Sequence, residues 1–279
     1  MSTVQAALLE GTRALKNLGI DSAQTDARWL MAKALDVPKD RLTLVLPDEI
    51  SASQFARFQV MLEQRFKRQP VSQILSERTF FSRNFRVTSD VLDPRPETER
   101  LVEIALQKPF QKVADLGTGS GCILLTLLAE TTGTRGVGGD VSEAALEVAK
   151  SNCKQLQLAG RATFIVSDWF SAFEGSFDLI VSNPPYIELA DIAHLSPEVR
   201  DWEPHLALTT GTDTLQAYRE IARSASRFLA PRGRILLEHG VGQAGEITEI
   251  FSKEGWSKIQ SFTDLTGRAR VLEVSSPKV

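Results

Sequence analysis

The chain has very few of the residues that build metal centres and disulfide frameworks. Its 279 residues include two cysteines and three histidines. Cys122 and Cys153 have no metal-ligand neighbour at short spacing, and His194, His205 and His239 are scattered singly. This scarcity argues against a zinc site and favours a reducing compartment. We therefore expect no bound metal and a cytoplasmic protein.

The sequence also lacks long hydrophobic runs and an excess of basic charge. No stretch approaches about 18 uninterrupted apolar residues, and residues 1–18 lack the apolar core of a secretory signal. The net charge of −3 and the pI of about 5.8 give no overall electrostatic footprint for nucleic acid. We expect no membrane segment and no stable nucleic-acid partner, although residues 65–86 hold a local basic cluster.

The hydrophobic pattern that is present divides the chain into three parts. Apolar residues at helical spacing predict helices over residues 3–18 and 23–35, and a third that starts at Ser51 or Ser53. We therefore predict a small all-helical domain over residues 1–70. Aromatic and β-branched residues around a possible turn at residues 82–84 predict a β-hairpin linker over residues 71–95.

Helical and strand patterns alternate from residue 96 to residue 279, which predicts an α/β domain with a mostly parallel sheet. Helices are expected to begin near Gly121, Ser142 and Asp213, and another to span residues 242–253. The predicted strands are residues 112–116, 136–140, 162–166, 177–181 and 234–238, followed by an antiparallel pair at 257–263 and 270–275.

A glycine-rich turn follows the first predicted strand of this domain. Three glycines in five residues allow the backbone to approach a ligand closely, which is typical of nucleotide and nucleoside sites. Cys122 stands where a dinucleotide fingerprint needs glycine or alanine, so the pattern is G-x-G-x-G. A tight turn without a ligand is the alternative. The residues expected to contact a ligand here are Gly117, Thr118, Gly119, Ser120 and Gly121.

Acidic residues follow the next two predicted strands. Asp140, with Val141 beside it, has the separation from the glycine turn that is expected of a carboxylate binding ribose hydroxyls. Capping the next helix is its alternative role, which Ser142 can fill instead. Asp168 and Trp169 offer a carboxylate for an exocyclic amine and an aromatic face for a purine, although aromatic residues after a strand are more often part of a core.

The fourth predicted strand is followed by Asn183, Pro184, Pro185 and Tyr186. The prolines donate no N–H and hold φ near −65°, so the turn is stiff and presents carbonyl oxygens. These oxygens and the Asn183 side-chain oxygen can accept both hydrogens of an –NH₂ group, against which Tyr186 can lie flat. A plain turn is the alternative interpretation. Four strand ends thus predict one site at the carboxyl edge of the sheet.

The ordered motifs DLGTGSG, GGDVS, SDWF and NPPY resemble those of class I S-adenosylmethionine-dependent methyltransferases. The fuller pattern resembles the PrmC/HemK family of protein-(glutamine-N5) methyltransferases, because PRPETE occupies residues 94–99, Glu203 and Pro204 follow NPPY, and LEHG occupies residues 237–240. The resemblance covers nearly the whole chain and is weakest over residues 1–70.

The chain departs from the family pattern at a few positions. Asp93 replaces an aliphatic residue before PRPETE, and Ser76 and Arg83 stand where glycine is frequent. Gly138 and Gly139 replace a small-apolar pair before the ribose acid, which predicts a weak second strand.

The resemblance implies a Rossmann-like, seven-stranded methyltransferase domain preceded by a helical substrate-docking domain. It implies methyl transfer from S-adenosyl-L-methionine, leaving S-adenosyl-L-homocysteine, to the side-chain amide nitrogen of the glutamine in the Gly-Gly-Gln loop of bacterial class-1 peptide chain release factors. Asn183 Oδ1 and the Pro184 carbonyl are expected to hold that nitrogen, with Tyr186 packed on the amide plane. Asp115 either reaches the amino group of S-adenosylmethionine or orders the loop.

Three alternatives remain open at this point. The same chemistry could act on a glutamine of a ribosomal protein, and NPPY could also hold the amino group of a flipped nucleic-acid base. The chain could instead be a binding module without activity. Arg95 and Glu97 could form an ion pair at the domain junction or touch the substrate, and His205 could shape the pocket rim or lie on the surface.

Overall fold

A computed structural model describes residues 3–264 and 266–275 of the chain. Residues 1–2, 265 and 276–279, which fall within the predicted domains, lie outside the described residues. The chain divides into two compact units. The first comprises residues 1–77 and 196–202, and the second comprises residues 78–195 and 203–279.

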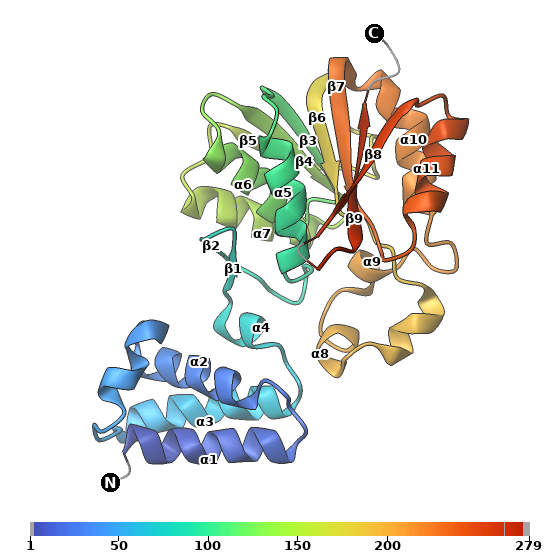
Figure 1. Ribbon diagram of the computed structural model, residues 1–279. Coiled ribbons are helices and arrows are strands. Elements are labelled where there is room, and N and C mark those ends of the chain that lie inside the picture. Colours follow the sequence, from blue (N-terminus) through green and yellow to red (C-terminus); the bar gives the residue numbers. More distant parts are fainter. Residues whose placement is uncertain (1–2, 265, 276–279) are drawn as a thin grey trace. The chain divides into compact units, whose positions relative to one another are not determined.

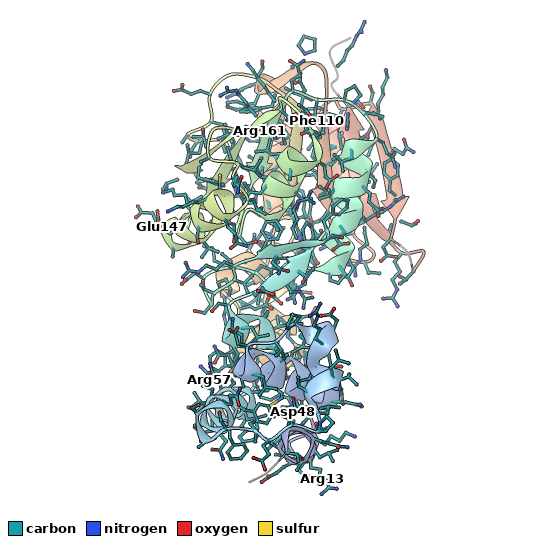
Figure 2. All side chains as sticks on the ribbon, turned by 90° about the vertical axis from the view of Figure 1, so that its left-hand side faces the viewer. Arg13, Asp48, Arg57, Phe110, Glu147 and Arg161 are labelled. Carbon is teal, nitrogen blue, oxygen red and sulfur yellow. The ribbon has the colours of Figure 1, made fainter. Side chains whose placement is uncertain are left out.

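The first unit is helical, as its apolar spacing predicts. Ser51 caps α3 by accepting a hydrogen bond from the Gln54 backbone N–H, while the Gln54 side chain accepts from the Ser51 N–H, which completes a capping box. Exposed charged residues such as Arg13, Asp48 and Arg57 lie on the outside of this unit (Figure 2). Its elements are α1 (Val4–Asn17), α2 (Ala23–Leu35), η1 (Lys39–Val45), α3 (Ala52–Phe66), α4 (Val71–Leu75) and α8 (Pro197–Arg200).

A buried ion network holds residues 196–202 within the helical unit. Arg65 is 4% exposed, and its Nε lies 2.8 Å from Asp26 Oδ2 while its Nη2 lies 2.9 Å from Glu198 Oε1. The Trp202 indole N–H donates to the Lys67 carbonyl at 3.0 Å. The segment that follows NPPY in the sequence therefore belongs in part to the helical unit.

The predicted linker of residues 71–95 is divided differently in the structure. Residues 71–75 form the helix α4, whose Val71 and Leu75 join the helical core. The β-hairpin is shorter than the predicted linker, and it belongs to the second unit because Phe80 and Phe85 pack into that unit's core. Its strands are β1 (Arg78–Phe80) and β2 (Arg83–Phe85).

The second unit has the predicted α/β architecture (Figure 1). Its seven-stranded sheet has the order β5-β4-β3-β6-β7-β9-β8, and the first five strands in this order are parallel. The antiparallel β9 and β8 close the edge, as the sequence pattern predicted. The strands are β3 (Lys112–Leu116), β4 (Arg135–Asp140), β5 (Ala162–Val166), β6 (Phe177–Ser182), β7 (Leu229–Glu238), β8 (Lys258–Thr263) and β9 (Ala269–Ser275).

Helices cover both faces of this sheet, and the strands alternate between two cores. In β6, Leu179 and Val181 face α5, α6 and α7, whereas Ile180 faces α10 and α11. Burial on both faces explains why residues 179–181 of β6 are all apolar. The remaining elements are η2 (Pro96–Thr98), α5 (Glu99–Leu106), α6 (Cys122–Glu130), α7 (Glu143–Gln155), η3 (Leu189–His194), α9 (His205–Leu208), α10 (Gln216–Ser224), η4 (Ala225–Arg227) and α11 (Ala244–Lys253).

The two glycines expected to weaken β4 are required by its packing. A Cβ on Gly139 would lie 2.4 Å from the Phe173 ring, and one on Gly138 would lie 2.8 Å from Thr118 Oγ1. The strand pairs with β3 and β5 along its length. The glycines therefore admit close neighbours while the strand remains intact.

None of the described helices is both long enough and apolar enough to cross a membrane.

Candidate active site

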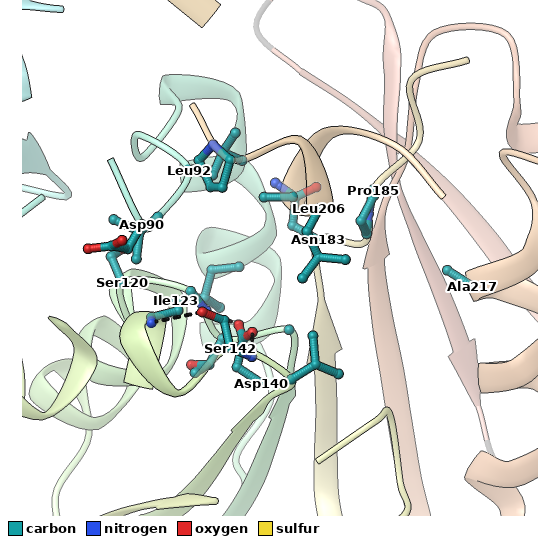
Figure 3. Close-up of a pocket in the computed structure, with 18 of the residues that line it drawn as sticks. Asp90, Leu92, Ser120, Ile123, Asp140, Ser142, Asn183, Pro185, Leu206 and Ala217 are labelled. Carbon is teal, nitrogen blue, oxygen red and sulfur yellow. Dashed lines mark hydrogen bonds between the residues drawn. The ribbon is translucent and has the colours of Figure 1, made fainter. Parts of the chain in front are cut away.

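A cavity of about 330 Å³ lies within the second unit, where β3, β4, β5 and β6 end (Figure 3). Figure 3 places Asp140 and Ser142 on one side of this cavity and Asn183, Pro185 and Leu206 on another. The predicted site residues that line the cavity are Gly117, Thr118, Gly119, Ser120, Asp140, Val141, Asp168, Trp169, Asn183 and Pro185. Four strand ends thus line one cavity.

Gly121, Pro184 and Tyr186 are not among the described residues that line the cavity. Gly121 has φ +77° at the start of α6, and a Cβ there would lie 3.0 Å from Leu125 and 3.3 Å from Ala149. Its positive φ and lack of a side chain serve the packing of α6. The structure therefore does not bring Gly121 to the ligand cavity.

The glycine turn presents open backbone to the cavity. Gly117 and Gly119 have φ of +68° and +53°, and a Cβ on either would meet no atom within 4 Å. The N–H groups of Gly117 and Thr118 donate to the Gly139 carbonyl at 2.9 and 3.0 Å, which ties the turn to β4. The empty space beside these glycines is a cradle that side chains would fill.

Asp140 connects the glycine turn to the helix after β4. Its Oδ2 accepts from the Gly119 N–H at 2.9 Å and its Oδ1 accepts from the Ser142 N–H at 3.0 Å. Ser142 caps α7 by accepting from the Ala145 N–H, so Asp140 is not required for that role. Each carboxylate oxygen can accept a second hydrogen bond, so the side chain keeps capacity for two ribose hydroxyls.

Asp168 and Trp169 form the part of the wall that follows β5. Trp169 is half-buried with φ +46°, a backbone conformation that is uncommon for a bulky residue. The Ser167 hydroxyl stabilises this turn by donating to the Trp169 carbonyl at 2.8 Å. A strained aromatic residue held beside an exposed carboxylate is suited to contact a purine ring and its amino group.

The NPPY turn follows β6 and is joined to its neighbours on both sides. The Ser182 hydroxyl donates to the Leu116 carbonyl at 2.7 Å, and the Asn183 side-chain amide donates to Thr98 Oγ1 at 3.3 Å. The Tyr186 carbonyl accepts from Gln243 Nε2 at 3.3 Å. Burial raises the pKa of the Tyr186 phenol to about 12, so this side chain is neutral at pH 7.

Three of the buried carboxyl groups near these turns have strongly raised pKa values. Burial raises the pKa of Asp115, of Glu203 and of Glu238 to about 7 in each case. The hydroxyl of Thr118 donates to Asp115 Oδ2 at 2.6 Å, which partly opposes the effect of burial. Asp115 is not among the described residues lining the cavity, so the hydrogen bond to Thr118 supports its loop-ordering role.

Arg95 and Glu203 form an ion pair within the second unit. Arg95 Nη2 lies 2.7 and 2.8 Å from the two Glu203 carboxylate oxygens, and Arg95 also lines the cavity. The sequence left open whether Arg95 forms an ion pair or touches substrate. The structure gives Arg95 an ion-pair partner, but that partner is Glu203 and not Glu97, and the pair anchors the chain where it returns from residues 196–202. His205, at the start of α9, is exposed.

Several cavity residues had no role in the sequence prediction. Leu92 and Leu206 supply apolar wall, and Thr98 binds Asn183. PRPETE marked the segment that contains Thr98, but spacing alone could not place it beside NPPY. Leu206 lines the cavity and is 60% exposed. Hydrophobic periodicity identifies buried positions and cannot identify an exposed leucine in a cavity wall.

The residues present fit S-adenosylmethionine. The open space beside Gly117 and Gly119 can admit part of the ligand close to the protein backbone. The Asp140 carboxylate can accept further hydrogen bonds, and the apolar wall at Leu92 and Trp169 suits an adenine ring. The fold and this set of residues define a class I methyltransferase that uses S-adenosylmethionine as methyl donor.

Comparisons with known proteins identify the family. The family model for the PrmC N-terminal domain matches residues 6–75, and that for the methyltransferase small domain matches residues 88–195. A release factor glutamine methyltransferase of Cereibacter sphaeroides is 50% identical over 93% of this chain and 93% of its own length. One from Rhodospirillum rubrum is 40% identical over 94% of this chain and 82% of its own length.

A solved methyltransferase from Pyrococcus furiosus supports the fold alone, with a TM-score of 0.54, 18% identity, and coverage of 72% of this chain and 92% of that chain. The chain belongs to the family of release factor glutamine methyltransferases.

Proposed function

We propose that this enzyme methylates the side-chain amide nitrogen of the glutamine in the Gly-Gly-Gln loop of bacterial class-1 release factors, in the cytoplasm. The names of its relatives support the release factor as substrate. The observation that carries the proposal is Asn183, which lines the cavity and whose –NH₂ group is held by Thr98. Its Oδ1 therefore remains to accept a hydrogen bond from a substrate –NH₂ group.

A carboxamide nitrogen is a poor nucleophile, because its lone pair is delocalised into the carbonyl group. Asn183 Oδ1 and the Pro184 carbonyl each accept one N–H of the substrate amide, which orients the nitrogen and favours electron density on it. Bound S-adenosylmethionine would supply the methyl group from its positively charged sulfur. The N–C bond would form as the S–C bond breaks, which leaves S-adenosylhomocysteine, and the nitrogen would release one of its two protons to solvent. This chain then acts by positioning and electrostatics, without a covalent enzyme intermediate.

The two predicted domains have separate tasks in this proposal. Residues 1–70 dock the release factor, and the domain from residue 96 onward carries out the transfer. Pro185 lines the cavity beside Asn183, and Tyr186 packs on the plane of the substrate amide. The ring of Tyr186 is half-buried and neutral, which suits a packing role and not a proton-transfer role.

The test is transfer of labelled methyl from S-adenosylmethionine to a purified release factor, beside a variant factor with alanine in place of the Gly-Gly-Gln glutamine. Isolated ribosomal proteins and duplex DNA are further arms. Label on the native factor alone supports both the reaction and the target residue. Label on a ribosomal protein or on DNA would replace the proposed substrate, and label on none would support a binding role without activity.

A further inference from the structure

Gln243 caps the start of α11, and its side-chain amide contacts three other segments of the second unit. Oε1 accepts from the Gly240 N–H at 2.9 Å, and Nε2 donates to the Tyr186 carbonyl at 3.3 Å. Nε2 also donates to Thr214 Oγ1 at 3.4 Å. One half-buried side chain therefore joins the turn after β6, the residues after β7 and the segment before α10.

The orientation of the Gln243 amide follows from its partners. The Gly240 N–H can only donate a hydrogen bond, and the Tyr186 carbonyl can only accept one. The oxygen of the amide must therefore face Gly240, and its nitrogen must face Tyr186. The opposite orientation would place donor against donor at Gly240 and acceptor against acceptor at Tyr186.

The NPPY turn needs support from side chains, because neither of its prolines has an N–H with which to form a backbone hydrogen bond. Thr98 holds the first residue of the turn by accepting from the Asn183 amide at 3.3 Å. Gln243 holds the last residue by donating to the Tyr186 carbonyl. The two ends of the turn are thus fixed by side chains from different parts of the chain.

Gly240 allows Gln243 and Tyr186 to come close to the same backbone position. A Cβ on Gly240 would lie 2.7 Å from Gln243 Oε1 and 3.2 Å from Cδ2 of the Tyr186 ring. The first distance is shorter than non-bonded contact allows, so a side chain at residue 240 would displace the Gln243 amide. The absence of a side chain there is what lets the amide reach both of its partners.

We propose that Gln243 is a positioning residue for methyl transfer, which holds the end of the NPPY turn so that Asn183 and the Pro184 carbonyl stay directed to the substrate amide. This inference rests on the proposed function. Gln243 is not among the described residues that line the cavity, so its effect passes through the backbone of the turn. A displacement of about 1 Å at a reacting group can lower a rate roughly 100-fold, so even a small shift of this turn would be measurable.

The first experiment compares Gln243→Ala with Gln243→Glu at pH 8, using the full-length enzyme and purified release factor. Alanine removes both contacts. Glutamate keeps an acceptor for the Gly240 N–H, but its ionised carboxylate cannot donate to the Tyr186 carbonyl. We expect both variants to lower kcat on the order of 10-fold, with the Kd for S-adenosylmethionine nearly unchanged.

Thr248→Ala is the matched control for this comparison. Thr248 lies further along α11, and its hydroxyl donates to the Ala244 carbonyl at 2.7 Å within the helix. The variant removes a hydrogen bond from the same helix without changing a contact of the NPPY turn, so its kcat should equal that of the wild type. Thermal unfolding of each variant shows whether a loss of kcat comes from misfolding. If the alanine variant does not fold, Gln243→Glu decides the question.

The second experiment combines Gly240→Ala with Gln243→Ala. The new methyl group displaces Gln243 in the single variant, whereas its nearest neighbour is absent from the double variant. We expect Gly240→Ala to lower kcat severalfold in the wild type and much less in the Gln243→Ala background. Losses of kcat that simply multiply would mean that the two residues act independently, which contradicts the proposal.

The outcomes separate this inference from the proposed function. A wild type that methylates no release factor overturns the function and the inference together. An active wild type with unchanged kcat in Gln243→Ala overturns the inference alone. A Gln243→Glu kcat equal to that of the wild type would also overturn it, because the contact with Gly240 would then be sufficient. A loss confined to the affinity for S-adenosylmethionine would assign Gln243 to cofactor binding and not to the turn.

Discussion

Two buried carboxyl groups, on β3 and β7, flank the central strand β6, and they differ in their hydrogen bonds. Asp115 Oδ2 accepts from the Thr118 hydroxyl at 2.6 Å within the glycine turn, whereas Glu238 Oε2 has no hydrogen-bond partner among the described residues. Burial raises both pKa values to about 7. The hydrogen bond to Thr118 ties the first carboxyl group to the glycine turn, on the side of the cavity expected to bind the methyl donor. The second carboxyl group ends β7, next to the strand that leads to Asn183, on the side expected to bind the substrate amide.

The largest expected effect is on kcat, for a change at Asn183 on the side of the cavity expected to bind the substrate amide. Asn183→Ala removes the side-chain acceptor for the substrate amide, and we expect kcat to fall roughly 100- to 1000-fold, as for the loss of a preorganised transition-state contact. The Kd for S-adenosylmethionine, measured by calorimetry, should change little. Unchanged turnover would reject the proposed hydrogen bond from the substrate amide to Asn183 Oδ1. A loss confined to the affinity for S-adenosylmethionine would show that Asn183 acts in cofactor binding and not in the transfer.

Asp140→Ala is the corresponding change on the side of the cavity expected to bind S-adenosylmethionine. The carboxylate holds the Gly119 and Ser142 N–H groups and is expected to bind ribose. Loss of charge-assisted hydrogen bonds of this kind costs about 1.5 to 3 kcal/mol, so the Kd for S-adenosylmethionine should rise roughly 10- to 100-fold. At saturating S-adenosylmethionine, kcat should be much less affected.

Asp140→Asn is the control for that measurement, because it keeps an acceptor oxygen without the charge. An intermediate Kd is expected. An unaltered Kd in the alanine variant would reject the ribose assignment.

The contrast between local and long-range contacts also explains which features the sequence could predict. Strands with both faces buried read as apolar runs, and a glycine turn between strand and helix is a local pattern, so β3, α6 and the carboxyl-edge site were predictable. Thr98 comes from a motif that the sequence singles out, yet no spacing rule places it beside Asn183, 85 residues further along the chain.

Long-range ion pairs were not predictable for the same reason. Arg95 was an open choice until the structure placed Glu203 beside it. Residues 196–202 carry no sequence signal for joining the helical unit, because that association rests on Glu198 meeting Arg65 and on Trp202 meeting the Lys67 carbonyl. The sequence prediction placed residues 71–75 in the linker, whereas in the structure they form a helix that packs into the helical core. Five residues are too few to show a helical periodicity in the sequence.

A change at Asp115 tests whether its raised pKa affects stability. The pKa is about 7 in the folded protein, compared with 3.8 for an unperturbed group. The folded state therefore binds more protons between these values, and the stabilisation is full below about pH 3.8 and is lost as the pH rises through about 7. Asp115→Asn should remove this loss, because the neutral amide oxygen can still accept from Thr118.

The measurement is the free energy of unfolding in urea from pH 5 to 8. The stability of Asp115→Asn relative to wild type should increase with pH, by at most about 1.4 kcal/mol per pH unit, the limit for one proton. A difference that is independent of pH would show that Asp115 is already ionised in the folded protein.

The smallest expected effects distinguish two glycines of the same turn. Gly119→Ala and Gly121→Ala each place a side chain at positive φ, which costs about 1 to 2 kcal/mol of stability. The Gly121 Cβ would also press on Leu125 and Ala149, whereas the Gly119 Cβ would enter open space beside the cavity. We expect Gly121→Ala to be the less stable variant in urea unfolding and Gly119→Ala to show the larger rise in the Kd for S-adenosylmethionine. A larger rise in Kd for Gly121→Ala would instead mean that Gly121 contacts the ligand and that the whole turn, including the start of α6, binds S-adenosylmethionine.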